Sequence, residues 1–156
     1  MTTPYPLDPA NLYHTGIVVA DLDAAARRLS AMAGYTWTTP MKGPVTIRTV
    51  SGTQTVEMQF VYSLQAPHVE LIEEVPGTPW ITAKDNAVHH LGYFTDDFAA
   101  TTAALQSQGF AIEMCHTTDG ETPSTFAYFR SSDDIRVEIV DRRVFGDLDA
   151  FLRAFQ

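Results

Sequence analysis

The chain contains an internal repeat, and this repeat constrains its fold more than any other feature. Residues 12–22 contain the motif His-x-Gly, followed by mostly apolar or small residues and then by Asp and the start of a helix-forming run. Residues 87–98 contain the same motif in the same order. His14 and His90 hold the same place in the two copies and lie 76 residues apart, which is nearly half of the 156-residue chain. We therefore expect a duplicated module.

Each copy also ends in a similar predicted strand. Residues 68–73 and residues 136–141 both contain Val-Glu followed by two aliphatic residues. One histidine and one glutamate thus recur in each copy. Imidazole and carboxylate groups are ligands of divalent metals such as Zn, Mn, Fe, Co and Ni. The residues indicate a candidate four-ligand metal site made of His14, Glu70, His90 and Glu138.

The alternation of strand side chains decides which residues share a face with these candidates. His14 shares a face with Leu12 and Gly16, and Glu70 shares one with Ile72. If a pseudo-twofold axis relates the two copies, the four equivalent positions can converge in one concave cup.

Charge and composition exclude several classes of function. The formal charge is −9 with only two lysines, which argues against binding to nucleic acid or to an anionic membrane. Cys115 is the only cysteine, so no intrachain disulfide is possible, as is typical of a reducing cytoplasm. The first residues lack the pattern of a signal peptide, and no run is long enough for a membrane span. We expect a cytoplasmic protein whose partner is a small-molecule substrate.

Apolar periodicity and turn residues predict the same order of elements in both copies, β-α-β-β-β. The predicted helices cover 22–33, between an Asp21 N-cap and Gly34, then 97–108, ending at Gly109, and 147–155. The predicted strands cover 12–19, 55–62, 68–75, 89–95, 110–116, 124–129 and 135–140, with strand-like material at 35–52 that Pro40, Gly43 and Pro44 interrupt. The predicted organisation is a first module at 11–75, a linker at 76–86, a second module at 87–142 and a C-terminal helix within 143–156.

With these motifs the chain resembles the vicinal oxygen chelate superfamily, which includes glyoxalase I, methylmalonyl-CoA epimerase, extradiol dioxygenases and bleomycin-binding proteins. The resemblance covers residues 11–142. It implies a single glyoxalase-like domain over 1–156, of the α+β class. In that fold two βαβββ modules, related by a pseudo-twofold duplication, form a cupped mixed β-sheet with helices outside. Members often dimerise, so a homodimer is expected.

The resemblance also implies one divalent metal ion, held at His14, Glu70, His90 and Glu138. His89 precedes the ligand His90, as in the epimerases, and is expected to point to the opposite face. Epimerases use the last ligand glutamate together with a second glutamate as an acid–base pair. On this resemblance Glu138 and Glu57 are the candidate catalytic residues. Glu70 stands where epimerases generally carry glutamine. The resulting set of two histidines and two glutamates is closer to the pattern of some glyoxalase I branches.

The leading hypothesis is a metal-dependent isomerase, epimerase or lyase. It would remove a proton next to a metal-bound carbonyl, through an enediolate-type intermediate, on a small oxo compound or a CoA thioester. Two alternatives stay open: an Fe(II) extradiol-type dioxygenase, and a metal-free binding protein of the resistance type. Single histidines on strands are more often structural than metal ligands, and His68 and His116 are expected to be solvated loop or strand-end residues.

Overall fold

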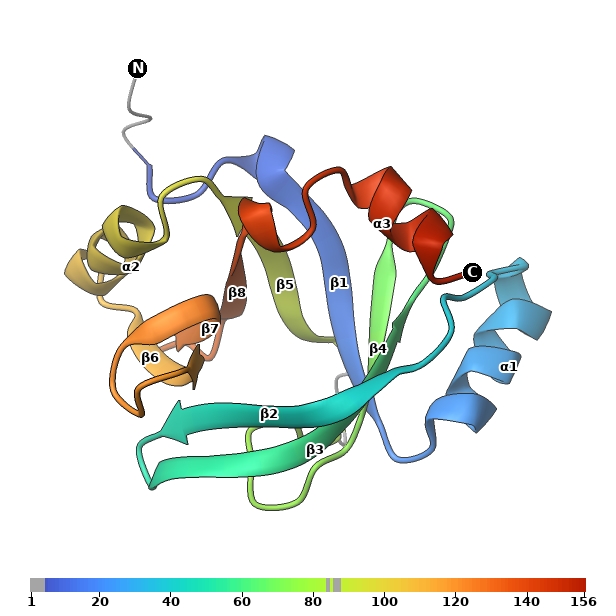
Figure 1. Cartoon of the computed structure of the whole chain (residues 1–156), viewed down its shortest axis with the longest axis horizontal. Coiled ribbons are helices and arrows are strands. Elements are labelled where there is room, and N and C mark those ends of the chain that lie inside the picture. The colour runs from blue at the N-terminus through green and yellow to red at the C-terminus, as the bar shows by residue number, and fades with distance from the viewer. Residues whose placement is uncertain (1–4, 84, 86–87) are drawn as a thin grey trace. The chain divides into compact units, whose positions relative to one another are not determined.

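The computed structural model of the chain describes residues 5–83, 85 and 88–156 (Figure 1). Its elements run β1, α1, β2, β3, β4 and then β5, α2, β6, β7, β8, with α3 at the end. Each half is therefore a βαβββ module. The predicted fold class, α+β with a duplicated module and mixed strand pairing, is confirmed.

The elements of the first half are β1 (Leu12–Val19), α1 (Leu22–Ala33), β2 (Met41–Thr49), β3 (Gly52–Tyr62) and β4 (Val69–Glu73). Those of the second half are β5 (Val88–Thr95), α2 (Phe98–Ser107), β6 (Ala111–Thr117), β7 (Pro123–Arg130) and β8 (Arg136–Asp141), followed by α3 (Leu148–Ala154). A 3-10 turn, Pro9–Asn11, precedes β1, and another, Arg142–Val144, follows β8.

Helix α1 begins at Leu22 as predicted, whereas α2 and α3 begin one residue later than predicted because their first aspartates are caps. Asp21, Asp97 and Asp147 are the N-caps, and each carboxylate accepts a hydrogen bond from the backbone N–H three residues on. This bond satisfies one of the donors that the first helical turn leaves without a partner. At the end of α1, Gly34 has a φ of 75°, a left-handed conformation that glycine adopts without a steric penalty.

The chain packs into two compact units, and they do not coincide with the two sequence halves. The second-module unit consists of His90–Val144, Thr46–Thr55 and the described residues up to Tyr13. The first-module unit consists of His14–Val45, Val56–His89 and Phe145–Gln156. The difference arises because the far end of the β2–β3 hairpin packs with the second half, and α3 packs with the first.

In the first-module unit, β1 pairs in parallel with β4, and β4 pairs antiparallel with β3. Val61 and Leu71 face α1 and form a buried cluster with Leu22. Because side chains alternate along a strand, Tyr62 and Glu70 lie on the other face. The helix thus covers one side of these strands and leaves the polar candidates on the opposite side.

In the second-module unit, β5 pairs in parallel with β8, and β8, β7 and β6 continue as antiparallel neighbours. Helix α2 covers one face of these strands (Figure 1). Its Leu105 packs against the buried residues Cys115, Ala127, Phe129, Val137 and Ile139. Glu138 and Tyr128 lie between these positions in sequence, so they face the side away from α2.

Strand β2 differs from the prediction, because it continues through Gly43 and Pro44, where the sequence indicates a break. The pairing of β2 with β6 covers Ile47 to Thr49. Pro44 precedes the residues that pair with β6.

The predicted linker lies between the end of β4 at Glu73 and the start of β5 at Val88, and its Trp80 is fully buried. Lys84, Asn86 and the neighbouring Ala87 lie outside the described residues. Among the helices of the described chain, none combines the length and the apolar character that crossing a membrane requires.

Candidate metal centre

His14 and Glu70 form a buried pair in the first-module unit. Nε2 of His14 lies 3.3 Å from Oε2 of Glu70, and their side chains are 0% and 6% exposed. The parallel register of β1 and β4 sets Gly16 directly beside Glu70. Glycine places no side chain there, so His14, two residues earlier on the same face, can reach the carboxylate.

His90 and Glu138 form the equivalent pair in the second-module unit. Nε2 of His90 lies 3.4 Å from Oε2 of Glu138, with side chains 0% and 9% exposed. Gly92 stands beside Glu138 in the parallel register of β5 and β8. The sequence repeat is thus a repeat of geometry: both modules bring a histidine and a glutamate together by the same register.

A tyrosine accompanies each pair. Tyr62 lies opposite Glu70 on β3, and Tyr128 lies opposite Glu138 on β7. The Tyr62 ring meets the His14 ring edge-on at 5.5 Å between centroids, and the Tyr128 ring lies 4.7 Å from that of His90. Their position opposite the Val-Glu strands gives a His–Glu–Tyr group in both modules, which the sequence analysis did not identify as a repeated set.

The distances within each pair fit two ligands of one metal ion. Nitrogen and oxygen ligands of Zn²⁺ and similar ions lie about 2.1 Å from the metal. At angles between about 90° and 110°, two such ligand atoms are separated by about 3.0–3.4 Å. The observed 3.3 Å and 3.4 Å fall within this range.

A simple histidine–glutamate ion pair fits these distances less well. A charge-assisted N–H···O bond is about 2.7–2.9 Å long between heavy atoms, and both pairs are longer. Taking two charged groups out of water without close contact is costly. A cation between the two donors would remove this cost, and the donor set of one imidazole and one carboxylate per module suits a divalent ion.

Glu57, the predicted second acid–base residue, lies on the other side of its strand. Strand β3 places Tyr62 opposite Glu70, so Glu57 alternates to the opposite face. Glu57 is exposed and lines a surface pocket with Gln59 and Glu73. Gln59 donates a hydrogen bond to Glu73, whose carboxylate also caps α1 by accepting from the Leu22 N–H. This position does not support a catalytic role for Glu57 beside Glu70.

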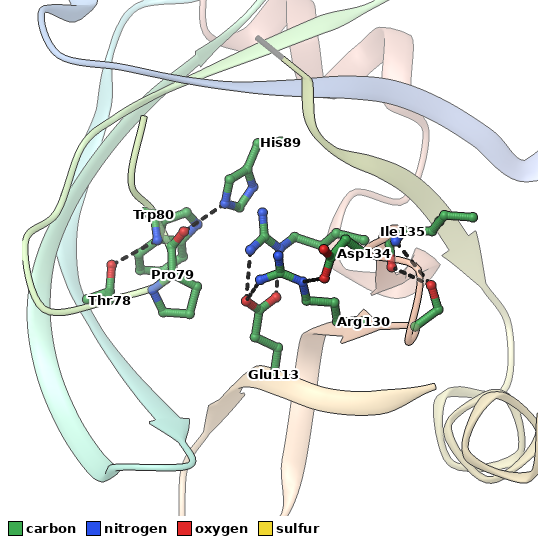
Figure 2. A network of polar contacts seen from close by, with 10 residues as sticks. Thr78, Pro79, Trp80, His89, Glu113, Arg130, Asp134 and Ile135 are labelled. Carbon is green, nitrogen blue, oxygen red and sulfur yellow. Dashed lines mark hydrogen bonds and ion pairs between the residues drawn. The ribbon is translucent and has the colours of Figure 1, made fainter. Parts of the chain in front are cut away.

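The other three histidines each lie next to a backbone carbonyl or a hydroxyl group, and two of them, His68 and His116, differ from their expected surroundings. His89 is buried, and its Nε2 lies 2.8 Å from the carbonyl oxygen of Pro79 (Figure 2). His68 and His116 are half-buried rather than solvated. Nδ1 of His68 lies 2.9 Å from the carbonyl oxygen of Ser63, and Nδ1 of His116 lies 2.8 Å from the hydroxyl of Thr125.

Comparison with solved structures shows the same fold in proteins of low sequence identity. Methylmalonyl-CoA epimerase of Mycobacterium tuberculosis is 17% identical with a TM-score of 0.57, over 90% of this chain and 92% of its own. A variant of the Streptomyces coelicolor methylmalonyl-CoA epimerase in complex with 2-nitronate-propionyl-CoA is 18% identical with a TM-score of 0.55, over 84% of this chain and 96% of its own. A hypothetical protein of Bacillus halodurans is 14% identical with a TM-score of 0.55, over 83% of this chain and 92% of its own.

Sequence comparison gives the family more directly. No curated protein matches the sequence. Residues 13–129, which are three quarters of the chain, match the family model of the Glyoxalase/Bleomycin resistance protein/Dioxygenase superfamily. That range includes His14, Glu70 and His90. The repeated βαβββ module, its His–Glu pairs and this match lead to one conclusion: the chain belongs to the Glyoxalase/Bleomycin resistance protein/Dioxygenase superfamily.

Proposed function

We propose that the protein is a divalent-metal-dependent isomerase, epimerase or lyase, and that its two His–Glu pairs bind the same ion. The observation that carries the proposal is the pair of buried histidine–glutamate contacts, which occur at equivalent positions of both modules with the spacing of metal ligands. The ion would be Zn, Mn, Co, Ni or Fe, all of which accept imidazole and carboxylate ligands.

The sharing of one ion follows from the number of ligands in each module. A tightly held divalent ion of this kind takes three or four protein ligands, and one pair supplies two. The repeat supplies the other two in the same chemical form. A metal that expands beyond four ligands still has room for an oxygen atom of a substrate.

The bound metal would supply positive charge that stabilises negative charge on a substrate carbonyl oxygen. In this proposal His14, Glu70 and His90 would hold the ion, and Glu138 would be both a ligand and the base. The Glu138 carboxylate takes the proton from the carbon next to the carbonyl, and the electron pair of that C–H bond moves to the carbonyl oxygen. The rings of Tyr62 and Tyr128, which contact the two histidines, help to exclude water from the reacting carbon.

A CoA thioester is the proposed substrate class. Thioesters acidify the neighbouring C–H bond, which suits abstraction by a carboxylate. The fold likeness to epimerases solved with 2-nitronate-propionyl-CoA and with methylmalonyl-CoA supports this choice. The homodimer expected from the sequence stays a prediction, which sedimentation of the purified protein tests.

The metal content of the purified protein tests the first half of the proposal. We expect about one divalent ion per chain in the wild type, and loss of that ion in His90→Ala. His68→Ala is the control, because His68 is a half-buried histidine that bonds to a backbone carbonyl and is not one of the four candidate ligands. Equal metal content in the wild type and His90→Ala, or none in the wild type after addition of Zn, Mn, Co, Ni or Fe(II), would refute a metal site here.

Exchange of a substrate proton with solvent tests the second half. Methylmalonyl-CoA and propionyl-CoA, incubated with metal-loaded protein in D2O, are expected to gain deuterium at the carbon next to the thioester. Proton NMR follows this gain directly. A metal-containing protein that exchanges neither compound would exclude the CoA thioester function while leaving the metal site intact.

A further inference from the structure

An irregularity in the β6–β7 pairing presents a strained threonine next to a histidine. Cys115 pairs with Ala127 but His116 pairs with Ser124, so Thr125 and Phe126 are extra residues on β7. Thr125 has a φ of 47°, a left-handed conformation that is unfavourable for a β-branched residue. Such strain costs about 1–3 kcal/mol and is frequent at functional sites.

The strained residue contacts His116 through its side chain. The Thr125 hydroxyl lies 2.8 Å from Nδ1 of His116. Within the described part of the chain, the structure records no hydrogen bond at the other ring nitrogen, Nε2. Because Nδ1 faces the bulge, Nε2 lies on the edge of the ring away from it. The ring is thus oriented at one nitrogen and open at the other.

His116 lies on the same strand face as the His90–Glu138 pair. Strand β6 pairs with β2 without a shift from Met114 to His116, so these two side chains share a face. Met114 lies opposite Tyr128, which in turn lies opposite Glu138. The irregularity therefore belongs to β7 and leaves His116 on the face that carries the pair.

A continuous series of aromatic rings connects the two histidines along this face. The ring of His90 contacts that of Tyr128, Tyr128 contacts Phe126, and Phe126 stacks on His116 at 5.9 Å with 27° between the planes. From strand spacing and rise per residue, the backbones of His116 and Glu138 are on the order of 12 Å apart. His116 is therefore a neighbour of the His90–Glu138 pair along the face and is not in direct contact with it.

We propose that His116 is a second acid–base residue of this centre, and that Thr125 is the residue that positions it. This inference rests on the proposed function. It gives His116 the role of second acid–base residue, for which the sequence suggested Glu57, a residue on the face of β3 opposite to that of Tyr62. Moving a proton from one face of a carbon to the other by a two-base route requires one group on each face. Glu138 is one of them. His116 is a half-buried group on the same strand face and, unlike Glu113, it is not held in ion pairs with Arg130 and Arg136.

The proton balance of the step is simple. Glu138 takes the proton from the substrate carbon, and the C–H electron pair moves to the carbonyl oxygen. His116 begins the step with a proton on each ring nitrogen. When the electron pair returns to the carbon, Nε2 of His116 donates its proton on the opposite side, and Nδ1 keeps its own. The enzyme then holds a protonated Glu138 and a neutral His116 with a free Nε2. Proton exchange with solvent, or turnover of the opposite stereoisomer, restores the starting state.

A threonine hydroxyl suits this role better than a carbonyl partner. A hydroxyl can donate to Nδ1 or accept from it, so it holds the ring whether Nε2 carries a proton or not. The backbone carbonyl beside His68 can only accept, which keeps a proton on Nδ1 of that ring. The contrast makes His68 the matched control for His116.

The test compares His116→Gln with His68→Gln in the metal-loaded protein. We expect His116→Gln to keep the wild-type circular dichroism and metal content, and to lose about 100-fold or more in kcat for methylmalonyl-CoA stereoisomer conversion. His68→Gln should stay within about threefold of the wild type. Thr125→Val should lower kcat about tenfold without raising KM, and Thr125→Ser, which keeps the hydroxyl, should restore it.

A measurement without turnover completes the test. Long-range ¹H–¹⁵N spectra of the metal-free protein should show a change of tautomer at His116 in Thr125→Val and none at His68. A His116→Gln protein with wild-type kcat, or an unchanged His116 tautomer in Thr125→Val, would overturn the inference alone. If the wild type with bound metal neither converts nor exchanges CoA esters, the proposed function fails and this inference falls with it.

Discussion

Replacing Glu113 by glutamine should destabilise the second-module unit, because this carboxylate compensates two arginines. Arg130 and Arg136 lie directly opposite one another on β7 and β8, where like charges repel. Glu113 accepts hydrogen bonds from Arg136 at 2.6 and 2.8 Å and from Arg130 at 3.1 Å (Figure 2). A register shift in the β6–β7 pairing between Ile112 and Met114 places the Glu113 side chain next to the two arginines.

The size of the effect follows from the burial of the three side chains. Glu113 is 19% exposed and Arg136 is 15% exposed, whereas Arg130 is 42% exposed. Breaking a fully buried pair costs about 3–5 kcal/mol. Because Arg130 is screened by solvent, we expect Glu113→Gln to lower the free energy of unfolding by about 2–3 kcal/mol. In a domain of this size, that loss corresponds to a fall in Tm of roughly 5–10 °C.

The pH dependence of the stability difference is a second, independent test of this prediction. Burial raises the pKa of Glu113, but the hydrogen bond and charge of Arg136 and the charge of Arg130 outweigh it, so the pKa is lowered. A carboxyl group with a lowered folded-state pKa stabilises the fold above its unfolded pKa and loses this contribution as pH falls through the folded value. The difference between wild type and Glu113→Gln should thus be complete at pH 7 and shrink below about pH 4.

Urea unfolding at pH 7 and pH 3.5, followed by circular dichroism, measures both expectations. Glu121→Gln is the control, because Glu121 is an exposed turn residue on the same unit. A Glu113→Gln protein within 0.5 kcal/mol of the wild type at pH 7, about the error of such a measurement, would refute the reasoning. A loss that stays constant down to pH 3.5 would show that it does not arise from the charge.

Three further outcomes are expected. Removing metal with a chelator should lower the Tm of the wild type, because an ion at 100 times its Kd stabilises the fold by about 2.7 kcal/mol; His90→Ala should show no such shift, and an equal shift would contradict binding at this pair. Glu57→Gln should keep kcat within about threefold, since Glu57 faces away from Glu70; a 100-fold loss would restore its predicted catalytic role. Gly34→Ala should cost about 1 kcal/mol in urea unfolding because φ is 75°, and an unchanged midpoint would contradict this.

The repeat was the most informative part of the sequence because it fixes positions and not only patterns. A His-x-Gly strand and a Val-Glu strand, each present twice, pointed to one histidine and one glutamate per module, and the structure brings each pair to 3.3 or 3.4 Å. Their role as metal ligands stays a prediction. The sequence also predicted the helix boundaries to within one residue. Asp21, Asp97 and Asp147 are local signals whose hydrogen bonds do not depend on the rest of the fold.

The sequence could not predict which face of β3 carries Glu57. The face on which a strand residue lies can be assigned only by alternation from a residue whose orientation is known. For β3 that reference is Tyr62, whose pairing with Glu70 is known only from the folded structure. The sequence also could not predict the composition of the two compact units. The packing of Thr46–Thr55 with the second half depends on contacts distant in sequence, and neither Pro44 nor Gly52 indicates it.

The two irregularities of the β6–β7 pair explain why Glu113 and His116 escaped the sequence reasoning. Strict alternation along β6 would place residues 113 and 114 on opposite faces. Instead, Met114 lies opposite Tyr128, and Glu113 bonds to Arg130 and Arg136, which lie on the same face as Tyr128. Further along, the extra residues on β7 place the Thr125 hydroxyl against His116. Alternation predicts faces only where the pairing is regular, and β-bulges are frequent next to functional sites. The residues that a repeat cannot predict are thus those where the second module departs from the first, and such departures are the natural place to look for what makes one member of a fold family act on its own substrate.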